Sequence, residues 1–299
     1  MIKIKVPATT ANLGAGFDTF GLALSLYNEF FIEESHRFTI ETNPKDRFLE
    51  NPENNLFIKV LKHIYSRENK KLPPLHIRQI TNIPVARGLG SSATAITAGI
   101  LAGFYLLDKP LTEEEFFDIA YRFEPHPDNL LPSWKGNFIT AVKHEKGTVY
   151  QQIDFPTDIK AVVLTPEIKL STQEARQVLP KQIPLEDAVF NIQRASLFIS
   201  ALMNKNYKLL KIAMEDKLHQ PYRKKLIPCF DNIVQNGYEE GALGVSISGA
   251  GTSIVALATE NFENIGKQML KALNKCKIKG NIYTLNIDKK GAILQTANT

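Results

Sequence analysis

Hydrophobic and polar residues alternate in IKIKV (residues 2–6), and this period of two predicts a β-strand with one buried face. FITAV (138–142) and TVYQQI (148–153) are expected to pair as a hairpin, and two strand-like runs flank a glycine turn within 243–258. Apolar runs that favour strand predict further strands at 20–34, 38–42, 75–80, 158–166 and 280–287.

Apolar residues at helical spacing predict the helices. In NNLFIKVLKHIY (54–65), Phe57, Leu61 and Ile64 fall on one face behind an asparagine that can cap the helix. Residues 92–107 are apolar nearly all round, so this helix is expected to be buried. Four more helices are predicted at 185–203, 206–219, 226–236 and 260–276.

Two helix starts carry a capping box, in which a hydroxyl and a carboxylate three residues later bond reciprocally to backbone N–H groups. Thr112 and Glu115 have this spacing, and so do Ser171 and Glu174. The segment HPDNLLPSWKGN (126–137) has two prolines and is expected to be a loop.

The mixture of strands and helices indicates an α+β protein. A length of 299 residues favours two domains of ordinary size. The sequence has no internal repeat, low-complexity tract or Gly/Ser linker, so the boundary is inferred from the change of pattern near 150–157. We expect domains at 1–155 and 156–299.

Composition narrows the function classes. Hydrophobic residues make up 43% of the chain, which is enough for a sizeable core. The net charge of +5 fits an anionic ligand, and because the basic residues are scattered we expect no nucleic acid partner. Two cysteines argue against a disulfide framework and suit a reducing compartment. With no signal segment and no run of about 18 apolar residues, we expect a soluble cytoplasmic protein and no membrane partner.

A glycine loop precedes the predicted buried helix in GLGSSATA (88–95). Gly88 and Gly90 allow the backbone to approach a ligand, and Ser91 and Ser92 can cap the helix. The unpaired N–H groups and the positive dipole of a helix N-terminus form an anion site. The lysine of a Walker A loop and the third glycine of a Rossmann fingerprint are absent. The alternative is a tight turn that leads into a buried helix.

Three other stretches combine glycines or prolines with polar side chains. Residues 6–24 surround Asn12 and Asp18 with small residues, as a loop that lines a ligand site would. FEPHPDNLLP (123–132) brings Glu124, His126, Asp128 and Asn129 into one stiff loop that could bind Mg²⁺ or a polar substrate. SISGAGTSIVAL (246–257) has glycines typical of close backbone approach. Each stretch, taken alone, is also consistent with an ordinary turn.

The four motifs, in this order, resemble those of the GHMP kinases, a family named for galactokinase, homoserine kinase, mevalonate kinase and phosphomevalonate kinase. The family pattern P-x-x-x-G-L-G-S-S-A is matched by PVARGLGSSA (84–93) without a gap, and its late glycine motif by SGAG (248–251). The homoserine kinase branch is the most similar, because VPATTANLGAGFDTFGLAL, HPDN, STQEARQVLP and HQPYR (219–223) look like its segments.

The resemblance implies a two-domain GHMP kinase fold. Its N-terminal domain would resemble domain 2 of ribosomal protein S5, its C-terminal domain would be ferredoxin-like, and the active site would lie between them. It also implies ATP and Mg²⁺ as cofactors, with the metal at Ser92 and Glu124. The ATP phosphates would be wrapped by Pro84, Val85, Ala86, Arg87, Gly88, Leu89, Gly90, Ser91, Ser92, Ala93 and Thr94.

For the second substrate, the resemblance implies L-homoserine, which would be phosphorylated to O-phospho-L-homoserine on the route to threonine. The homoserine-contacting positions would be Asn12, Asp18, His126, Thr172, Arg176, Arg223 and Gly249. Asp18 suits the ammonium group, and the two arginines suit the carboxylate. Asn129, with Arg176 and Arg223, would orient or stabilise the reacting groups.

Mevalonate kinases place an aspartate near the reacting hydroxyl, where this sequence has Thr172, so no carboxylate base is expected. Family members often pair, so a homodimer is expected. Two other interpretations stay open: another small-molecule GHMP kinase such as a mevalonate kinase, and a non-catalytic binding protein on the same scaffold.

Overall fold

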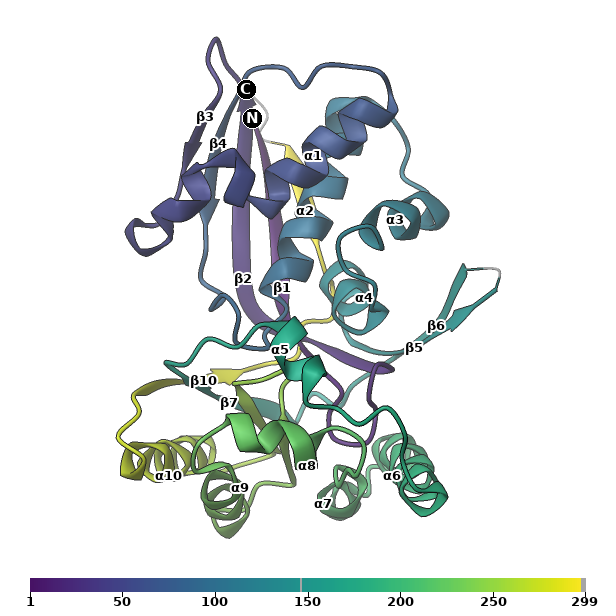
Figure 1. The fold of residues 1–299 in the computed structure, drawn as a ribbon, viewed down its shortest axis with the longest axis vertical. Helices are drawn as coiled ribbons and strands as arrows, with labels where there is room; N and C mark the ends of the chain where they lie inside the picture. Colours follow the sequence, from purple (N-terminus) through teal and green to yellow (C-terminus); the bar gives the residue numbers. More distant parts are fainter. Residues whose placement is uncertain (146, 297–299) are drawn as a thin grey trace.

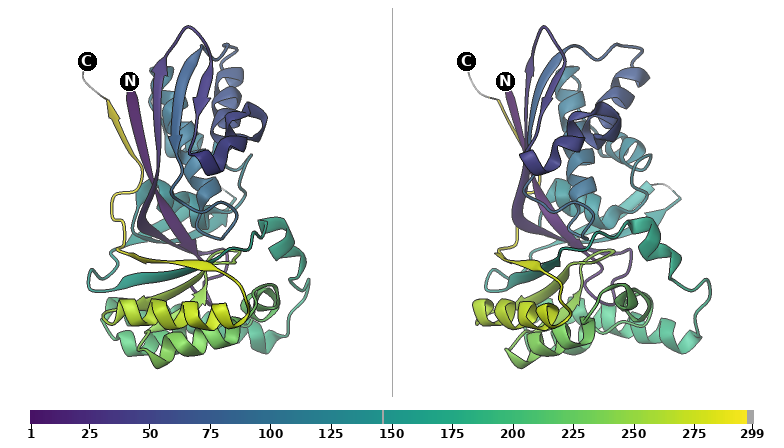
Figure 2. Two further views of the ribbon diagram at one scale, coloured as in Figure 1. Left: turned by 90° about the vertical axis from the view of Figure 1, so that its left-hand side faces the viewer. Right: turned by 60° about the vertical axis from the view of Figure 1, so that its left-hand side comes forward.

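Two β-sheets, each covered by helices, are joined end to end in the computed structural model of the protein, which describes residues 1–145 and 147–296 (Figure 1). The two ends of the described chain, at Ile2 and Thr296, pair with each other at the far end of the first sheet (Figures 1 and 2). The strands are β1 (Ile2–Ala11), β2 (Phe20–Glu34), β3 (Thr39–Glu41), β4 (Leu75–Ile80), β5 (Phe138–His144), β6 (Gly147–Ile153), β7 (Lys160–Pro166), β8 (Gly244–Ile247), β9 (Ile254–Ala258), β10 (Gly280–Leu285) and β11 (Ile293–Thr296).

The first sheet has the order β11-β1-β2-β4-β3, and β2 also pairs with the β5–β6 hairpin. Neighbouring strands are antiparallel except for β3 and β4, which are parallel. Helices cover one face of this sheet (Figure 2). These helices are α1 (Leu56–Arg67), α2 (Ser91–Leu106), α3 (Glu113–Ala120) and α4 (Pro127–Lys135).

The second sheet is antiparallel, with the order β10-β7-β9-β8. Its helices lie on the side away from the first sheet (Figure 2), and α5 lies near the junction of the two halves (Figure 1). The helices of this half are α5 (Thr172–Gln177), α6 (Leu185–Met203), α7 (Leu210–Ala213), α8 (Gln220–Arg223), α9 (Phe230–Glu239) and α10 (Phe262–Lys275).

One hydrophobic cluster joins the two halves. Phe20 of β2 and Phe138 of β5 both pack against Phe198 of α6, with ring centroids 5.3 and 5.5 Å apart, and Val255 of β9 belongs to the same cluster. All four side chains are buried, so the hydrophobic effect resists separation of the halves. The relative position of the two sheets is therefore fixed by the core.

Several local patterns predicted these elements correctly. The alternation in IKIKV gives β1, and the apolar run at 20–34 is β2. The Asn55 side chain accepts a hydrogen bond from the Ile58 N–H and caps α1. Both capping boxes are present, Thr112 with Glu115 at α3 and Ser171 with Glu174 at α5. The hairpin β5–β6 pairs as predicted.

The loop predicted at 126–137 is wrong, because Pro127–Lys135 forms α4. Pro127 occupies the first turn, where a missing N–H costs nothing, and Pro132 lies within the helix. Burial of Leu130 and Leu131 stabilises the helix, and Trp134 stacks on Phe116 at 3.8 Å. Tertiary packing therefore outweighs the local preference of Pro132 against a helix interior.

Two other segments differ from the pattern. The helix predicted at 206–219 is broken, because the Asp216 carboxylate accepts hydrogen bonds from the backbone N–H groups of Leu218, His219 and Gln220 and so favours a turn over a helix. Strand β11 was not predicted, and it pairs with β1 at the opposite end of the chain. The two sheets are therefore not formed by two continuous segments, and the division at 155/156 stays a prediction.

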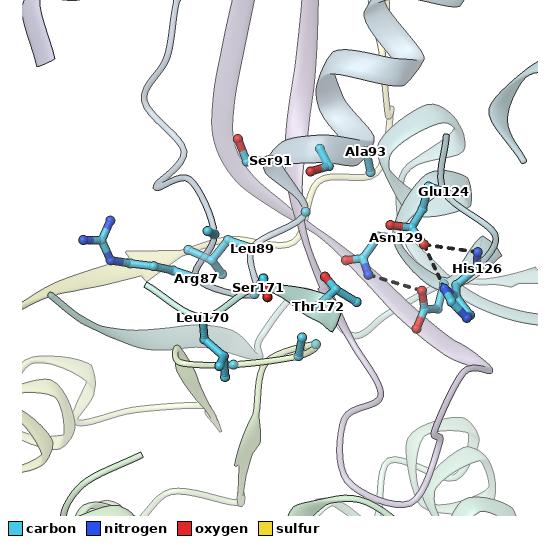
Figure 3. Close-up of a pocket in the computed structure, with 18 of the residues that line it drawn as sticks. Arg87, Leu89, Ser91, Ala93, Glu124, His126, Asn129, Leu170, Ser171 and Thr172 are labelled. Carbon is cyan, nitrogen blue, oxygen red and sulfur yellow. Dashed lines mark hydrogen bonds and ion pairs between the residues drawn. The ribbon is translucent and has the colours of Figure 1, made fainter. Parts of the chain in front are cut away.

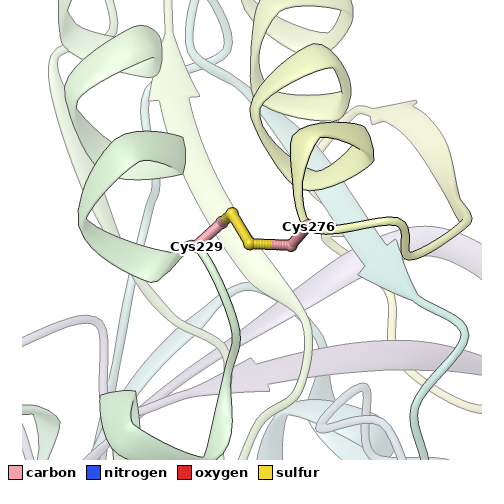
Figure 4. Close-up of a disulfide and its surroundings, with 2 residues drawn as sticks. All are labelled: Cys229 and Cys276. Carbon is pink, nitrogen blue, oxygen red and sulfur yellow. A yellow bond between two sulfur atoms is a disulfide. The ribbon is translucent and has the colours of Figure 1, made fainter.

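Cys229 and Cys276 form a disulfide between the start of α9 and the end of α10 (Figure 4). The sequence argued against a disulfide framework and did not predict this single bond. Disulfides are rare in reducing compartments, so the cysteines no longer support such a location.

None of the helices in the described part of the chain is both long enough and apolar enough to cross a membrane.

Candidate active site

A cavity of about 270 Å³ lies where the two halves meet. The loop between β4 and α2 lines one part of it, and Glu124, His126 and Asn129 line another (Figure 3). The cavity is lined by Asn12, Asp18, Pro84–Ala93, Glu124, His126, Asp128, Asn129, Leu170–Thr172, Arg176, Arg223 and Gly249–Gly251. The sequence-predicted site residues thus lie together, with the exception of Thr94.

The loop before α2 is held from behind through its carbonyl groups. The carbonyl oxygens of Ala86, Arg87 and Leu89 accept hydrogen bonds from the backbone N–H groups of Leu170, Ser253 and Thr9, respectively. The carbonyl oxygen of Gly88 lies 2.6 Å from the Ser248 hydroxyl. These bonds fix the backbone of the loop, so its geometry does not depend on a ligand to order it.

The helix N-terminus beside this loop is free of a side-chain cap. Gly90 is the N-cap residue of α2 with φ +66°, a conformation that favours glycine, and α2 begins at Ser91. The expectation that Ser91 and Ser92 cap the helix is wrong, because they are its first two residues. The first N–H groups of α2 have no partner within the helix, and the helix dipole is positive there. This end of the cavity can therefore bind an anion such as a phosphate.

Thr94 faces the protein interior. It is fully buried, and its hydroxyl accepts a hydrogen bond from the Asn28 side chain at 2.9 Å and donates one to the Ser91 carbonyl oxygen at 2.8 Å. These two bonds place its side chain behind the anion end of the cavity rather than in its wall.

Polar side chains of the α4 segment form a second wall (Figure 3). The Glu124 Oε1 atom lies 2.8 Å from Nδ1 of His126. Asn129 donates to Oδ1 of Asp128 at 3.2 Å and accepts from the Thr9 hydroxyl at 2.7 Å. Asn129 thus connects the Asp128 carboxyl group with Thr9 of β1, whose N–H also holds the loop before α2.

Sequence analysis placed Asp128 in the candidate polar loop at 123–132, but the family resemblance gave it no specific role. Its side chain is only 4% exposed. Burial, and secondarily repulsion from Asp18, raises the pKa of this carboxyl group to about 7. Groups with perturbed pKa values cluster at functional sites, so Asp128 joins the candidate residues, and only the fold shows that it is buried.

Opposite charges meet at the other end of the cavity. Arg176 donates to both carboxylate oxygens of Asp18, at 2.6 and 3.2 Å. Arg223 is 2% exposed and donates to the carbonyl oxygens of Gly249 and Ala175, at 3.1 and 3.2 Å. Burial, and secondarily the nearby Arg176, lowers the pKa of the Arg223 guanidinium to about 10, which still leaves it charged at neutral pH.

Phe17 is a neighbour of this cluster that sequence reasoning missed. Its ring lies 5.5 Å from the guanidinium carbon of Arg176 and 5.1 Å from that of Arg223, and it stacks on the buried imidazole of His219. The only sequence signal was its position next to Asp18. One ring therefore supports both guanidinium groups through cation–π contacts.

The described residues contain no cluster of three or more His, Cys, Asp or Glu side chains that could hold a metal ion. Ser92 and Glu124 nevertheless both line the same cavity. Mg²⁺ prefers oxygen ligands and often takes only one or two from the protein when phosphates and waters supply the rest. A hydroxyl and a carboxylate therefore fit a nucleotide-bound Mg²⁺.

Sequence comparison defines the class of protein to which this site belongs. Residues 55–137 match the model of the GHMP kinases N terminal domain, and residues 198–275 match that of the GHMP kinases C terminal domain. The chain belongs to the GHMP kinase family, and the expected two-domain fold is confirmed.

Within the GHMP kinase family, the proteins similar to this chain include homoserine kinases. A homoserine kinase of Persephonella marina is 60% identical over 295 residues, which cover 99% of this chain and 98% of the relative. A homoserine kinase of Aquifex aeolicus is 48% identical over 92% of this chain and 93% of its own length. The crystal structure of homoserine kinase from Cytophaga hutchinsonii superposes with a TM-score of 0.87 at 29% identity and covers 98% of this chain and 97% of that one.

Proposed function

We propose that this protein is an ATP-dependent homoserine kinase that transfers the γ-phosphoryl group of ATP to the hydroxyl of L-homoserine and forms O-phospho-L-homoserine, on the route to threonine. The observation that carries the proposal is one cavity with two chemically different ends. The uncapped N-terminus of α2 offers N–H groups to phosphates, and Asp18, Arg176 and Arg223 offer charges to a zwitterion. The names of the similar proteins point to the same substrate.

Each end of the cavity has a defined task. The loop 84–93 binds the triphosphate through backbone N–H groups. Asp18 binds the ammonium group of homoserine, and Arg176 and Arg223 bind its carboxylate. Asn12, His126, Thr172 and Gly249 complete the wall around the amino acid.

Phosphoryl transfer requires alignment and charge stabilisation more than covalent help from the protein. Asn129 lines the same cavity, where its hydrogen bonds to Thr9 and Asp128 hold its side chain. It orients the reacting groups, while the arginines stabilise negative charge. Thr172 occupies the position of the mevalonate kinase aspartate, and its hydroxyl is a much weaker proton acceptor than a carboxylate.

Mg²⁺ belongs to the same proposal. Ser92 and Glu124 would hold it, and it would neutralise charge on the phosphates. Ser92→Ala should raise the Mg²⁺ concentration needed for half-maximal activity, whereas Ser66→Ala, at an exposed position on α1, should not. An unchanged Mg²⁺ requirement in Ser92→Ala would remove Ser92 from the metal site.

The test of the function is a coupled ATPase assay with L-homoserine and mevalonate as alternative acceptors, with the product checked by phosphorus NMR. Formation of O-phosphohomoserine supports the proposal. Turnover of mevalonate without homoserine would replace it with the mevalonate kinase alternative, and no heat on titration with MgATP would favour a non-catalytic protein.

Assembly and location complete the proposal. A homodimer follows from the family resemblance, and α6 exposes apolar side chains at Leu185, Ile192 and Met203 that a second copy would cover. Light scattering on the purified protein tests the dimer. A cytoplasmic location is part of the same proposal, and cell fractionation tests it.

A further inference from the structure

The two residues assigned to opposite charges of the substrate bind each other in this structure. Nη2 of Arg176 lies 2.6 Å from Oδ1 of Asp18, and Nη1 lies 3.2 Å from Oδ2. The side chains are 32% and 34% exposed, and both line the cavity. The pair is thus a two-bond ion pair that solvent only partly screens, and its geometry is the planar fork that arginine and carboxylate prefer.

One hydrogen-bond donor of the Arg176 side chain has no acceptor among the described residues. This donor is the Nε atom, which is buried. A buried donor without a partner is costly, so an acceptor that reached it would be favoured. Phe17 lies against this guanidinium and that of Arg223, which keeps the two cations on one aromatic ring.

We infer that Asp18 and Arg176 form an exchangeable ion pair that selects substrates carrying both an ammonium and a carboxylate group. The inference rests on the proposed function, because it takes the amino acid to bind in this cavity. A zwitterion offers Asp18 a cation and Arg176 an anion in the same event, so each loses one partner and gains another. A ligand with a single charge offers nothing to the other member of the pair and must compete with it.

The inference predicts opposite shifts for ligands that differ by one group. 4-Hydroxybutanoate is homoserine without the ammonium, and 3-aminopropan-1-ol is homoserine without the carboxylate. In Asp18→Asn, the dissociation constant of homoserine should rise about tenfold or more, because its ammonium loses a charged partner. The dissociation constant of 4-hydroxybutanoate should fall about threefold or more, because Arg176 is released from Asp18.

Arg176→Gln gives the mirror image. Homoserine should bind more weakly because its carboxylate loses one arginine, whereas 3-aminopropan-1-ol should bind more tightly because Asp18 no longer has an internal cation. A residue with only a structural role would weaken every ligand alike. The reversal of sign therefore separates ion-pair exchange from general damage to the pocket.

The measurement is calorimetric titration of the full-length protein and both variants with the three ligands. Glu215→Gln is the matched control, because it removes a carboxylate that pairs with Arg194 at 3.0 and 3.2 Å outside this cavity, and it should leave all three constants unchanged. Thermal melting checks that each variant is folded, and if one is not, the other decides.

Weaker or unchanged binding of 4-hydroxybutanoate to folded Asp18→Asn would overturn the inference, and so would weaker or unchanged binding of 3-aminopropan-1-ol to folded Arg176→Gln. If homoserine binds the wild-type protein but these reversals are missing, the exchange alone fails. If the wild-type protein does not bind homoserine, the proposed function fails with it.

Discussion

The side-chain amide of Asn12 donates a hydrogen bond of 2.9 Å to the carbonyl oxygen of Gly249, which connects the end of β1 with the glycine turn between β8 and β9. Arg223 donates to the same oxygen at 3.1 Å, and the Gly249 N–H donates to the Ala11 carbonyl oxygen at 3.0 Å. Residues from both halves of the molecule are therefore positioned around a single residue, Gly249, in the cavity wall.

Replacing Asn12 with aspartate tests this connection. The carboxylate has nearly the same shape and still accepts from the Asp18 N–H, as Asn12 does at 3.0 Å, but it cannot donate to Gly249. Loss of a buried hydrogen bond, with an acceptor left facing an acceptor, should lower the free energy of unfolding by about 1–3 kcal/mol. The KM for homoserine should rise at the same time. Urea denaturation and steady-state kinetics measure the two effects.

Asn69→Asp is the control, because Asn69 is exposed and also has a positive φ (+53°, against +73° for Asn12). Its effect on the free energy of unfolding should stay within about 0.5 kcal/mol. If the two variants lost equal stability, the loss would come from the backbone conformation rather than from the bond to Gly249.

Gly88→Ala should disable the phosphate end of the cavity. Gly88 has φ +78°, and a Cβ atom there would lie 2.1 Å from the Ser248 carbonyl oxygen, so the loop has to move. Because the backbone N–H groups are the proposed phosphate ligands, the KM for ATP should rise about tenfold or more, with a smaller change in the KM for homoserine. Steady-state kinetics with each substrate varied in turn measures this difference.

Gly241→Ala is the control that separates the steric clash of the added Cβ atom from the backbone strain of a positive φ. Gly241 has φ +96°, and nothing lies within 4 Å of the added carbon. It should lose some stability and leave both KM values unchanged. A normal KM for ATP in Gly88→Ala would mean that the loop does not hold the nucleotide.

Sequence patterns predicted the features that depend on residues close together in the sequence. Alternation gave β1, spacing gave the capping boxes, and glycine content located the loop at Gly88 and Gly90. Nearly all the candidate site residues taken from the four motifs line one cavity, because a family resemblance carries information about tertiary structure that a local pattern lacks.

Features that depend on contacts between residues far apart in the sequence were not predicted. Packing makes a helix of the proline-containing α4, and β11 forms only beside β1. The burial that perturbs Asp128 comes from the surrounding fold, and Asp18 meets Arg176 across 158 positions of sequence. Each of these features depends on how the helices and strands pack together, and a local sequence pattern does not specify that packing.

The disulfide should contribute measurable stability. Cys229 and Cys276 are 47 positions apart, and a link across that distance restricts the unfolded chain. The double substitution Cys229→Ser with Cys276→Ser should lower the free energy of unfolding by about 2–4 kcal/mol. Urea denaturation with and without a thiol reductant measures it: reductant should weaken the wild-type protein and leave the double variant unaffected. Equal stability of the two proteins without reductant would show that the link is not formed in solution.

Asp128 should make stability depend on pH. Burial raises its pKa from 3.8 to about 7, so between these values the folded protein keeps a proton that the unfolded chain releases. The folded state then binds more protons, and the free energy of unfolding falls as pH rises through this window, with a slope of up to about 1.4 kcal/mol per pH unit. Below pH 4 and above pH 7 this contribution is constant.

Asp128→Asn removes the ionisation and keeps an oxygen that can accept from Asn129, as Oδ1 of Asp128 does at 3.2 Å. The variant should therefore gain stability relative to the wild-type protein as pH rises from 5 to 7, while Asp108→Asn, at an exposed position, controls for the change of side chain. Urea denaturation at half-unit pH steps gives the difference curve. A flat curve between pH 5 and 7 would mean that the Asp128 carboxylate is already ionised at pH 5 in the folded protein, because something in the cavity compensates its charge.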